Sequence, residues 1–225
     1  MKPWLLLDST QVPGNGGELR LYRRGDDFSI IIVGHGELMN SRVHGSEDAL
    51  AEYTCARLVE RVQPRLLIGG LGMGFTLAAA LRHLGDQARV VVAELVPAVV
   101  EWNRGALGLQ AGHPLQDPRV VVHEGDVARL IVREQQGFDA ILLDVDNGPE
   151  GLTRKENDWL YGVNGLSAAY AALRPRGVLA VWSAGPDEHF VQRLRKVGFV
   201  VEQVRVHAHG TKGARHVIWF ARRGD

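Results

Sequence analysis

Glycines cluster in one short segment, where an apolar run passes into a helical pattern. The segment reads Leu-Leu-Ile-Gly-Gly-Leu-Gly-Met-Gly over residues 66–74, so that Gly70, Gly72 and Gly74 alternate with larger residues. Glycines allow the backbone to turn sharply and leave its N–H groups uncovered at the start of a helix. This pattern favours a strand–turn–helix unit whose bare backbone contacts a ligand. A tight turn without a ligand is the alternative interpretation.

Acidic residues stand at the ends of three later apolar runs, at Glu94, Asp126 and Asp144. A carboxylate at Glu94 could accept hydrogen bonds from both hydroxyls of a ribose, and one at Asp126 could accept a hydrogen bond from the exocyclic amine of an adenine. The alternatives are an exposed Glu at a strand end and an N-cap Asp at a helix start. Because ligands of such sheets bind at the carboxyl ends of the strands, these acids and the glycines would converge on one crevice.

Apolar runs and helical patterns alternate after residue 64. Strands are predicted over 65–69, 88–94, 119–123, 138–144 and 177–183, with a closing pair over 199–206 and 215–221. Helices are predicted over 75–84, 98–107, 126–134, 159–173 and 188–197. The first strand runs are continuously apolar, as expected of a parallel sheet covered on both faces. The alternation predicts a right-handed, doubly wound α/β fold.

Residues 1–45 have a different pattern. Short apolar runs are separated by glycine-rich and proline-containing turns, which predicts a small antiparallel β element. Ser46 is the expected cap of the next helix and Glu47 an acid of its first turn. The apolar face of this helix is predicted to extend as far as Val62. We therefore expect an N-terminal β element over 1–45 and an α/β domain over 46–225.

Composition excludes several classes of protein. The chain of 225 residues has 26 Lys and Arg against 26 Asp and Glu, so a nucleic-acid partner is not expected. With 45% hydrophobic residues the chain is not disordered, and no apolar stretch is long enough for a signal peptide or a membrane span. The single Cys55 permits no intrachain disulfide, and a cytoplasmic protein without a membrane partner is expected. His207 and His209 alternate without a nearby carboxylate or Cys, so no metal is expected.

These segments together resemble a known family, the class I S-adenosylmethionine-dependent fold and, within it, the spermidine synthase (polyamine aminopropyltransferase) group. The resemblance rests on Ile68-Gly69-Gly70 with Gly74, Ala93-Glu94-Leu95, Asp117–Val120 leading to Gly125-Asp126, Phe138–Asp144 with Asp146, and Leu173–Ala180. It covers roughly residues 64–184, with a weaker match upstream. It implies a Rossmann-like, seven-stranded sheet and a homodimer. S-adenosylmethionine or its decarboxylated form would be the donor.

The resemblance also implies the residues of the site. The donor-binding residues would be Gly69, Gly70, Gly72, Gly74, Glu94, Asp126, Val127 and Asp144. Asp144 and Asp146 are the candidate catalytic carboxylates, because an amine acceptor must lose a proton during transfer. Candidates for acceptor contacts are His44, Tyr53, Trp159 and Tyr161. For Trp159, a position in the core is the alternative. For His44 it is a solvent-facing position in a loop, and for Asp144 and Asp146 it is a helix cap or a loop turn.

The sequence departs from the family pattern at the sites that would choose the substrate. Gly72 stands where the family has the Asp that binds the amine of the donor, and Met39 stands where its hairpin has Gln. The acceptor loop is shortened to Asp144–Asn147. The leading interpretation is a transferase that uses either donor with a small amine acceptor, such as a polyamine. A small-molecule methyltransferase and a non-catalytic nucleoside-binding protein on the same fold are the alternatives.

Overall fold

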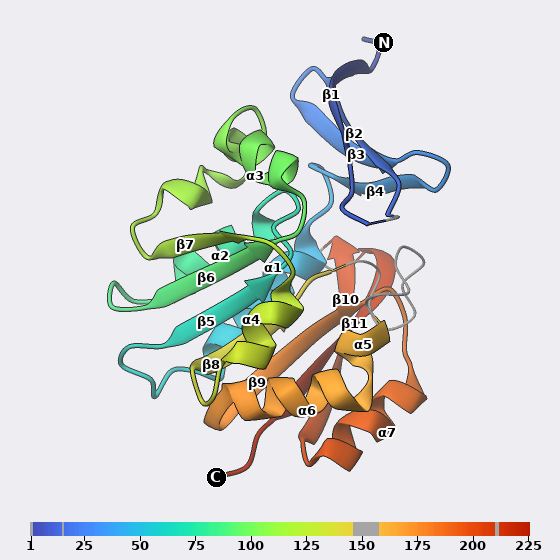
Figure 1. The fold of residues 1–225 in the computed structure, drawn as a ribbon. Helices are drawn as coiled ribbons and strands as arrows, with labels where there is room; N and C mark the ends of the chain where they lie inside the picture. The colour runs from blue at the N-terminus through green and yellow to red at the C-terminus, as the bar shows by residue number, and fades with distance from the viewer. Residues whose placement is uncertain (1, 15, 146–157, 210–211) are drawn as a thin grey trace.

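The computed structural model describes residues 2–14, 16–145, 158–209 and 212–225 and contains two sheets (Figure 1). The small sheet is antiparallel, with the strand order β1-β2-β3-β4. The large sheet has the order β10-β11-β9-β8-β5-β6-β7. Its strands β5 to β9 are parallel, and β11 is antiparallel to both β9 and β10. The predicted seven-stranded α/β fold with a small N-terminal β element is therefore confirmed.

The elements have the following bounds. The small sheet consists of β1 (Leu5–Gln11), β2 (Glu18–Arg24), β3 (Asp27–Ile32) and β4 (Gly36–Asn40). The large sheet consists of β5 (Arg65–Gly69), β6 (Arg89–Glu94), β7 (Val120–Glu124), β8 (Phe138–Leu143), β9 (Leu173–Ser183), β10 (Val200–His209) and β11 (Lys212–Arg222). The helices are α1 (Gly45–Ala56), α2 (Phe75–His83), α3 (Pro97–Arg104), α4 (Val127–Arg133), α5 (Asp158–Tyr161), α6 (Val163–Ala172) and α7 (Glu188–Val197). No helix in these described ranges is both long enough and apolar enough to cross a membrane.

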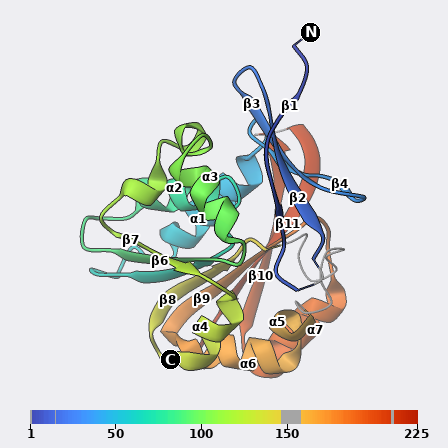
Figure 2. The same cartoon turned by 45° about the horizontal axis from the view of Figure 1, so that its top comes forward.

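Helices cover both faces of the large sheet, as the alternating pattern predicts. Ile68 of β5 is fully buried in the cluster that contains α1, α2 and α3, whereas its neighbour Leu67 is fully buried in the cluster that contains α4, α6 and α7. Neighbouring residues of a strand point to opposite faces, so a continuously apolar strand can serve both layers. Figures 1 and 2 show these two helical layers on either side of the sheet.

The small sheet lies beyond one end of the large sheet (Figures 1 and 2). Its residues Leu21, Phe28 and Ile30 are buried in the same cluster as α1 and β5, so the two sheets share one apolar core. Ile30 and Ile32 also face the ends of β5 and β6 across a cavity. The N-terminal strands therefore position side chains over the carboxyl ends of the parallel strands.

Three local expectations were wrong. Helix α1 ends at Ala56 and not near Val62, which is 84% exposed. Ser46 does not cap α1, because the helix begins at Gly45 and the Ser46 hydroxyl donates to the Glu47 carboxylate at 2.6 Å. The helix predicted over 159–173 is interrupted at Gly162, whose extended backbone separates α5 from α6. A Gly has little helical preference, and an apolar stripe alone does not reveal such a break.

Candidate functional site

The glycine turn follows β5 and packs against the residue that follows β8. Gly70 has a φ of +87°, and a Cβ at this position would collide with the carbonyl oxygen of Asp144. The Asp144 N–H donates to the carbonyl oxygen of Gly69 at 3.0 Å, which fixes the two strand ends side by side. Only a glycine allows this backbone conformation and this close approach together. The turn therefore places the Asp144 side chain beside the start of α2.

Glu94 is held at the end of β6 by backbone donors. Its side chain is buried, with Oε2 accepting from the Leu71 N–H at 2.9 Å and Oε1 accepting from the Val96 N–H at 2.9 Å. Burial raises the pKa of this carboxyl, and the backbone donors oppose the increase. The alternative of an exposed Glu at a strand end is therefore wrong. The backbone N–H groups of Gly72 and Leu95 also stabilise the charged form of this carboxyl.

Asp126 has a structural contact and also faces the cavity. Its Oδ1 accepts from the Ala128 N–H at 2.9 Å, so it is the N-cap of α4. It also lines a cavity of about 150 Å³ together with Val127, Glu94 and Gly70. The cap and ligand interpretations are thus compatible at this residue.

This space, the glycine-turn cavity, lies between the small sheet and the ends of β5, β6, β7 and β8. Its charged lining residues are Glu94, Asp126 and Asp144, and no Lys, Arg or His lines it within the described ranges. Its remaining walls are largely apolar, with Ile30 and Met39 from the small sheet. A cavity whose charged groups are all carboxylates favours a cationic ligand.

Two departures from the family pattern meet in the wall of this cavity. A Cβ at Gly72 would lie 3.0 Å from the Sδ atom of Met39, and the φ of Gly72 is +53°. The Met39 side chain therefore covers Gly72 and takes the space into which a longer side chain at position 72 would extend.

A second space, the α1 cavity, adjoins the first and has a volume of about 280 Å³. Leu38, Met39, Gly72 and Asp144 line both cavities, so these residues mark where the two meet. The other walls of the α1 cavity come from the first turn of α1, the first turn of α2, the end of β9 and β11.

Asp144 is the carboxylate at this junction. The Thr76 hydroxyl donates to its Oδ2 at 2.6 Å. Burial raises the pKa of Asp144 to about 7, the negative charge of Glu47 adds to the increase, and the Thr76 hydrogen bond opposes it. Asp144 can therefore accept or release a proton near neutral pH. Asp146, the second catalytic candidate, lies outside the described residues.

Glu47 is a site residue that we did not predict. It lines the α1 cavity, and burial raises the pKa of its carboxyl. The Ser46 hydroxyl that donates to Glu47 also lies 3.0 Å from Nδ1 of His216 on β11. Its sequence signal was that of an ordinary acid in the first turn of a helix, and only the position of α1 over the sheet places it in a cavity.

None of the four candidates for acceptor contacts belongs to the described lining of either cavity. His44 stacks on Phe75, a lining residue of the α1 cavity, with the ring centroids 4.2 Å apart. Tyr161 is buried, and its Oη donates to the Val145 carbonyl at 3.2 Å, which supports the chain after β8. Trp159 is 39% exposed, so its alternative position in the core is wrong. The Tyr53 ring lies near the Phe220 ring of β11, with the two centroids 6.4 Å apart.

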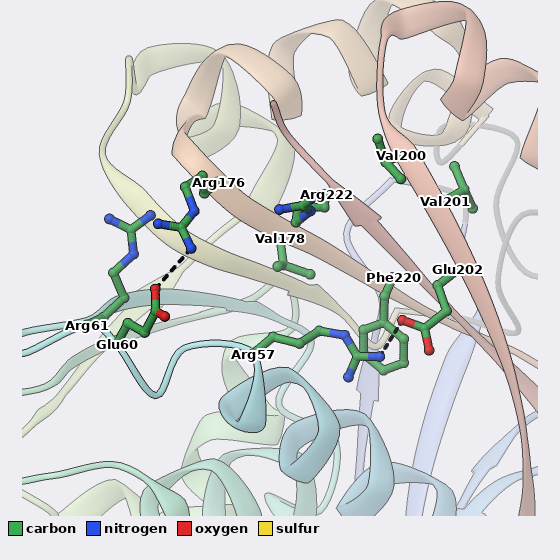
Figure 3. Close-up of a pocket in the computed structure, with 10 residues that line it drawn as sticks. All are labelled: Arg57, Glu60, Arg61, Arg176, Val178, Val200, Val201, Glu202, Phe220 and Arg222. Atoms are coloured by element: carbon green, nitrogen blue, oxygen red, sulfur yellow. Dashed lines mark hydrogen bonds and ion pairs between the residues drawn. The ribbon is translucent and has the colours of Figure 1, made fainter. Parts of the chain in front are cut away.

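A larger hollow of about 320 Å³, the arginine cleft, lies at the other end of β9 (Figure 3). Arg57 pairs with Glu202 at 2.6 Å and lies over the Phe220 ring at 3.9 Å from its centroid. Arg176 pairs with Glu60 at 2.9 Å. The acids of this cleft are therefore neutralised by the protein itself, and none of the predicted site residues that the structure describes lines it.

No group of three His, Cys, Asp or Glu side chains that could hold a metal ion occurs in the part of the chain that the structure describes. Of the two alternating histidines, the side chain of His209 lies outside the described set.

No protein-family model matches the sequence, and no curated protein matches it. Among solved structures, spermidine synthase from Thermotoga maritima has a TM-score of 0.74 at 19% identity, over 97% of this chain and 73% of that chain. A spermidine synthase in complex with the transition state analogue AdoDATO has a TM-score of 0.73 at 19% identity, over 97% and 72%. A probable spermidine synthase from Corynebacterium glutamicum has a TM-score of 0.63 at 14% identity, over 96% and 79%. The chain therefore has the fold of the spermidine synthases, a Rossmann-like α/β fold of the methyltransferase type, as the resemblance in sequence predicts.

Proposed function

We propose that this protein is a transferase that moves an aminopropyl group from decarboxylated S-adenosylmethionine to a small amine. The observation that carries the proposal is the position of Asp144, which lines both the glycine-turn cavity and the α1 cavity. A donor in the first cavity and an acceptor in the second would meet at this carboxylate. Its pKa of about 7 suits a group that takes up a proton near neutral pH.

The glycine-turn cavity would hold the nucleoside of the donor. Glu94, fixed by two backbone N–H groups, would accept hydrogen bonds from the ribose hydroxyls. Asp126 would accept a hydrogen bond from the adenine amine while it caps α4. The uncovered backbone at Gly70 and Gly72 would lie against the ligand, as the alternating glycines suggest.

The charge of the cavity supports the decarboxylated donor. S-adenosylmethionine carries a carboxylate, which would face three acids in a cavity with no basic side chain in its described lining. The decarboxylated form carries only positive charges. The contact between Met39 and Gly72 argues against this donor. It removes the usual site for the donor amine and so favours the methyltransferase alternative.

The chemical step needs positioning and a proton acceptor, because a sulfonium donor is already activated. The lone pair of the acceptor nitrogen forms a bond to the carbon attached to sulfur. The electrons of the carbon–sulfur bond pass to sulfur, which becomes a neutral thioether. The Asp144 carboxylate takes up the proton that the new ammonium group loses. Asp146 is a second candidate for this role and stays a prediction.

Ligand binding and turnover together test the proposal. Calorimetry would measure the binding of S-adenosylmethionine, decarboxylated S-adenosylmethionine and methylthioadenosine, followed by assays of putrescine with each donor. Preferred binding of the decarboxylated donor together with aminopropyl transfer is the expected result. Tight binding of S-adenosylmethionine without transfer to putrescine would support the methyltransferase alternative. Binding of methylthioadenosine without turnover of either donor would support the non-catalytic alternative.

The homodimer expected from the resemblance stays a prediction. The edge strand β1 exposes Leu5, Leu6 and Leu7 in succession, although alternate side chains of a strand face opposite ways. This strand is the surface that we propose for contact with a second copy of the chain.

A further inference from the structure

The glycine turn gains little rigidity from its own residues. Gly70, Gly72 and Gly74 all have φ values in the left-handed region, at +87°, +53° and +83°. A glycine loses more conformational freedom on folding than any other residue, so such a turn keeps one shape only where other groups hold it. Gly72, at its centre, lines both cavities, and its conformation therefore matters for a ligand in either.

Asn103 of α3 holds the carbonyl side of Gly72. Asn103 is 1% exposed, and its Nδ2 donates to the carbonyl oxygen of Gly72 at 2.8 Å and to that of Val99 at 2.9 Å. Because both partners are carbonyl oxygens, which only accept, the atom that faces them is the amide nitrogen. The bond to Val99, one turn back on the same helix, fixes the side chain, and the bond to Gly72 ties the turn to α3.

Glu94 holds the other side of the same residue. The Gly72 N–H stabilises the charged form of the Glu94 carboxyl, and the Leu71 N–H donates to Glu94 Oε2 at 2.9 Å. Gly72 is thus held at its N–H from β6 and at its carbonyl from α3. Glu94 lines the glycine-turn cavity, whereas Asn103 belongs to the described lining of neither cavity. Any effect of Asn103 on a ligand would therefore pass through the turn.

A second observation distinguishes Asn103 from an ordinary buried residue. Its Oδ1 atom is buried without a hydrogen-bond partner among the described residues, and it lies 3.1 Å from the position that a Cβ of Gly74 would take. An unpaired buried acceptor costs stability, which an apolar side chain would avoid. A role in shaping the turn therefore explains an asparagine at this position better than stability alone.

We propose that Asn103 is a positioning residue for the donor: it holds the Gly72 carbonyl towards α3 and so keeps the backbone of the glycine turn in the shape that binds the nucleoside. This inference rests on the proposed function for the place of the donor, but not on the reaction. Proton transfer stays with Asp144. Loss of the Asn103 amide should thus weaken donor binding and leave the chemical step nearly unchanged.

Two variants of Asn103 and one matched control test the inference. Asn103→Leu keeps the branching of the side chain without its hydrogen-bonding atoms, and Asn103→Ala removes the amide without adding volume. Thr54 is also fully buried, and its hydroxyl donates to the Leu50 carbonyl at 2.7 Å, one turn back on α1. Thr54→Val therefore removes a hydrogen bond like that between Asn103 and Val99, at a residue outside the described lining of both cavities.

Calorimetry with methylthioadenosine, which needs no turnover, measures the main effect. We expect both Asn103 variants to raise its Kd about 5- to 30-fold, because each loses a hydrogen bond that preorganises the site. Thr54→Val should change the Kd less than about twofold. In the transfer assay with putrescine, the KM of the donor should rise by a similar factor in the Asn103 variants, while kcat and the KM of putrescine change less than about threefold.

Hydrogen exchange of the unliganded protein reports on the turn itself. The Leu71 N–H donates to Glu94, and the Gly74 N–H donates to the Leu71 carbonyl at 2.8 Å. In both Asn103 variants, a peptide that covers residues 70–76 should exchange faster than in the wild type. In Thr54→Val the same peptide should exchange at the wild-type rate.

Three results would overturn the inference. Wild-type affinity for methylthioadenosine in the Asn103 variants would show that the bond to Gly72 does not shape the site. An equal loss of affinity in Thr54→Val, with an equal loss of stability in urea, would show a general structural effect. An unchanged donor KM with a lower kcat would place Asn103 in the chemical step.

Failure of the proposed function would be visible separately. A wild type that binds methylthioadenosine but transfers no group to putrescine would contradict that function, and the Kd values and exchange rates of the variants would still decide the role of Asn103. A wild type that binds no nucleoside would overturn both.

Discussion

The arginine cleft and the α1 cavity both contain acidic side chains, but they neutralise them differently. In the cleft, Glu202 and Glu60 each pair with a guanidinium group. In the α1 cavity, the Ser46 hydroxyl donates to Glu47 and the Thr76 hydroxyl to Asp144, and no Lys or Arg belongs to the described lining. The acids of the arginine cleft are thus neutralised by its own guanidinium groups, whereas the described lining of the α1 cavity contains two acids and no guanidinium or ammonium group. Recessed carboxylates without a Lys or Arg partner are better evidence of a ligand site than the size of a cavity.

The largest effect that this comparison predicts is the loss of Asp144. We expect Asp144→Asn to lower kcat by about 10²- to 10⁴-fold, because the proton of the acceptor nitrogen loses its base. Donor affinity should change much less. Steady-state kinetics and calorimetry of the same variant measure the two effects, and equal losses in both would make Asp144 a donor ligand. In the wild type, kcat should rise as the pH passes about 7, where Asp144 ionises.

Glu94 sharpens the comparison. Its carboxylate accepts hydrogen bonds from backbone N–H groups, and no Arg belongs to the described lining of its cavity. We expect Glu94→Ala to weaken binding of methylthioadenosine and of both donors by roughly 1–3 kcal/mol, the cost of losing hydrogen bonds to a charged group. Calorimetry measures this change. An affinity equal to that of the wild type would show that Glu94 does not contact the ribose.

The raised pKa of Asp144 should also make the stability of the unliganded protein depend on pH. The pKa of Asp144 is about 7 in the fold against 3.8 for an unperturbed Asp, so the folded state binds more protons between these values. The free energy of unfolding should therefore decrease as the pH rises from about 4 to about 7. Because water reaches the cavity, we expect the contribution of Asp144 to be on the order of 1 kcal/mol.

Urea unfolding of the wild type and of Asp144→Asn at about pH 5 and about pH 8 would measure this contribution. The variant should lose less stability than the wild type between the two conditions. The same pH dependence in both proteins would contradict the raised pKa.

The arginine cleft should give the smallest effect. Glu202 has a side chain that is 60% exposed, and its ion pair with Arg57 is open to solvent. We expect Glu202→Gln to change the free energy of unfolding by less than about 1 kcal/mol and to leave turnover unchanged. Denaturant unfolding and the putrescine assay measure these two quantities. A loss of turnover would give the cleft a function and break the comparison.

Much of the fold could be predicted because its signals are local. Continuous apolar strands indicated a covered parallel sheet, and α7 (Glu188–Val197) has the bounds that its pattern predicts. The strand β4 has no such signal, since Glu37 and Asn40 lie within it, and it is held by pairing with β3. The interruption at Gly162 also escaped prediction, because the apolar stripe continues across it.

The sequence by itself determined the glycine turn and the acids at the ends of β6, β7 and β8. These residues meet because the carboxyl ends of parallel strands lie at one edge of a sheet, so their order along the chain implies their position in space. Only the tertiary structure decided that Met39 covers Gly72 and that Glu47 faces the same cavity as Asp144. Those contacts depend on how the small sheet and α1 pack over the large sheet, which no local pattern encodes.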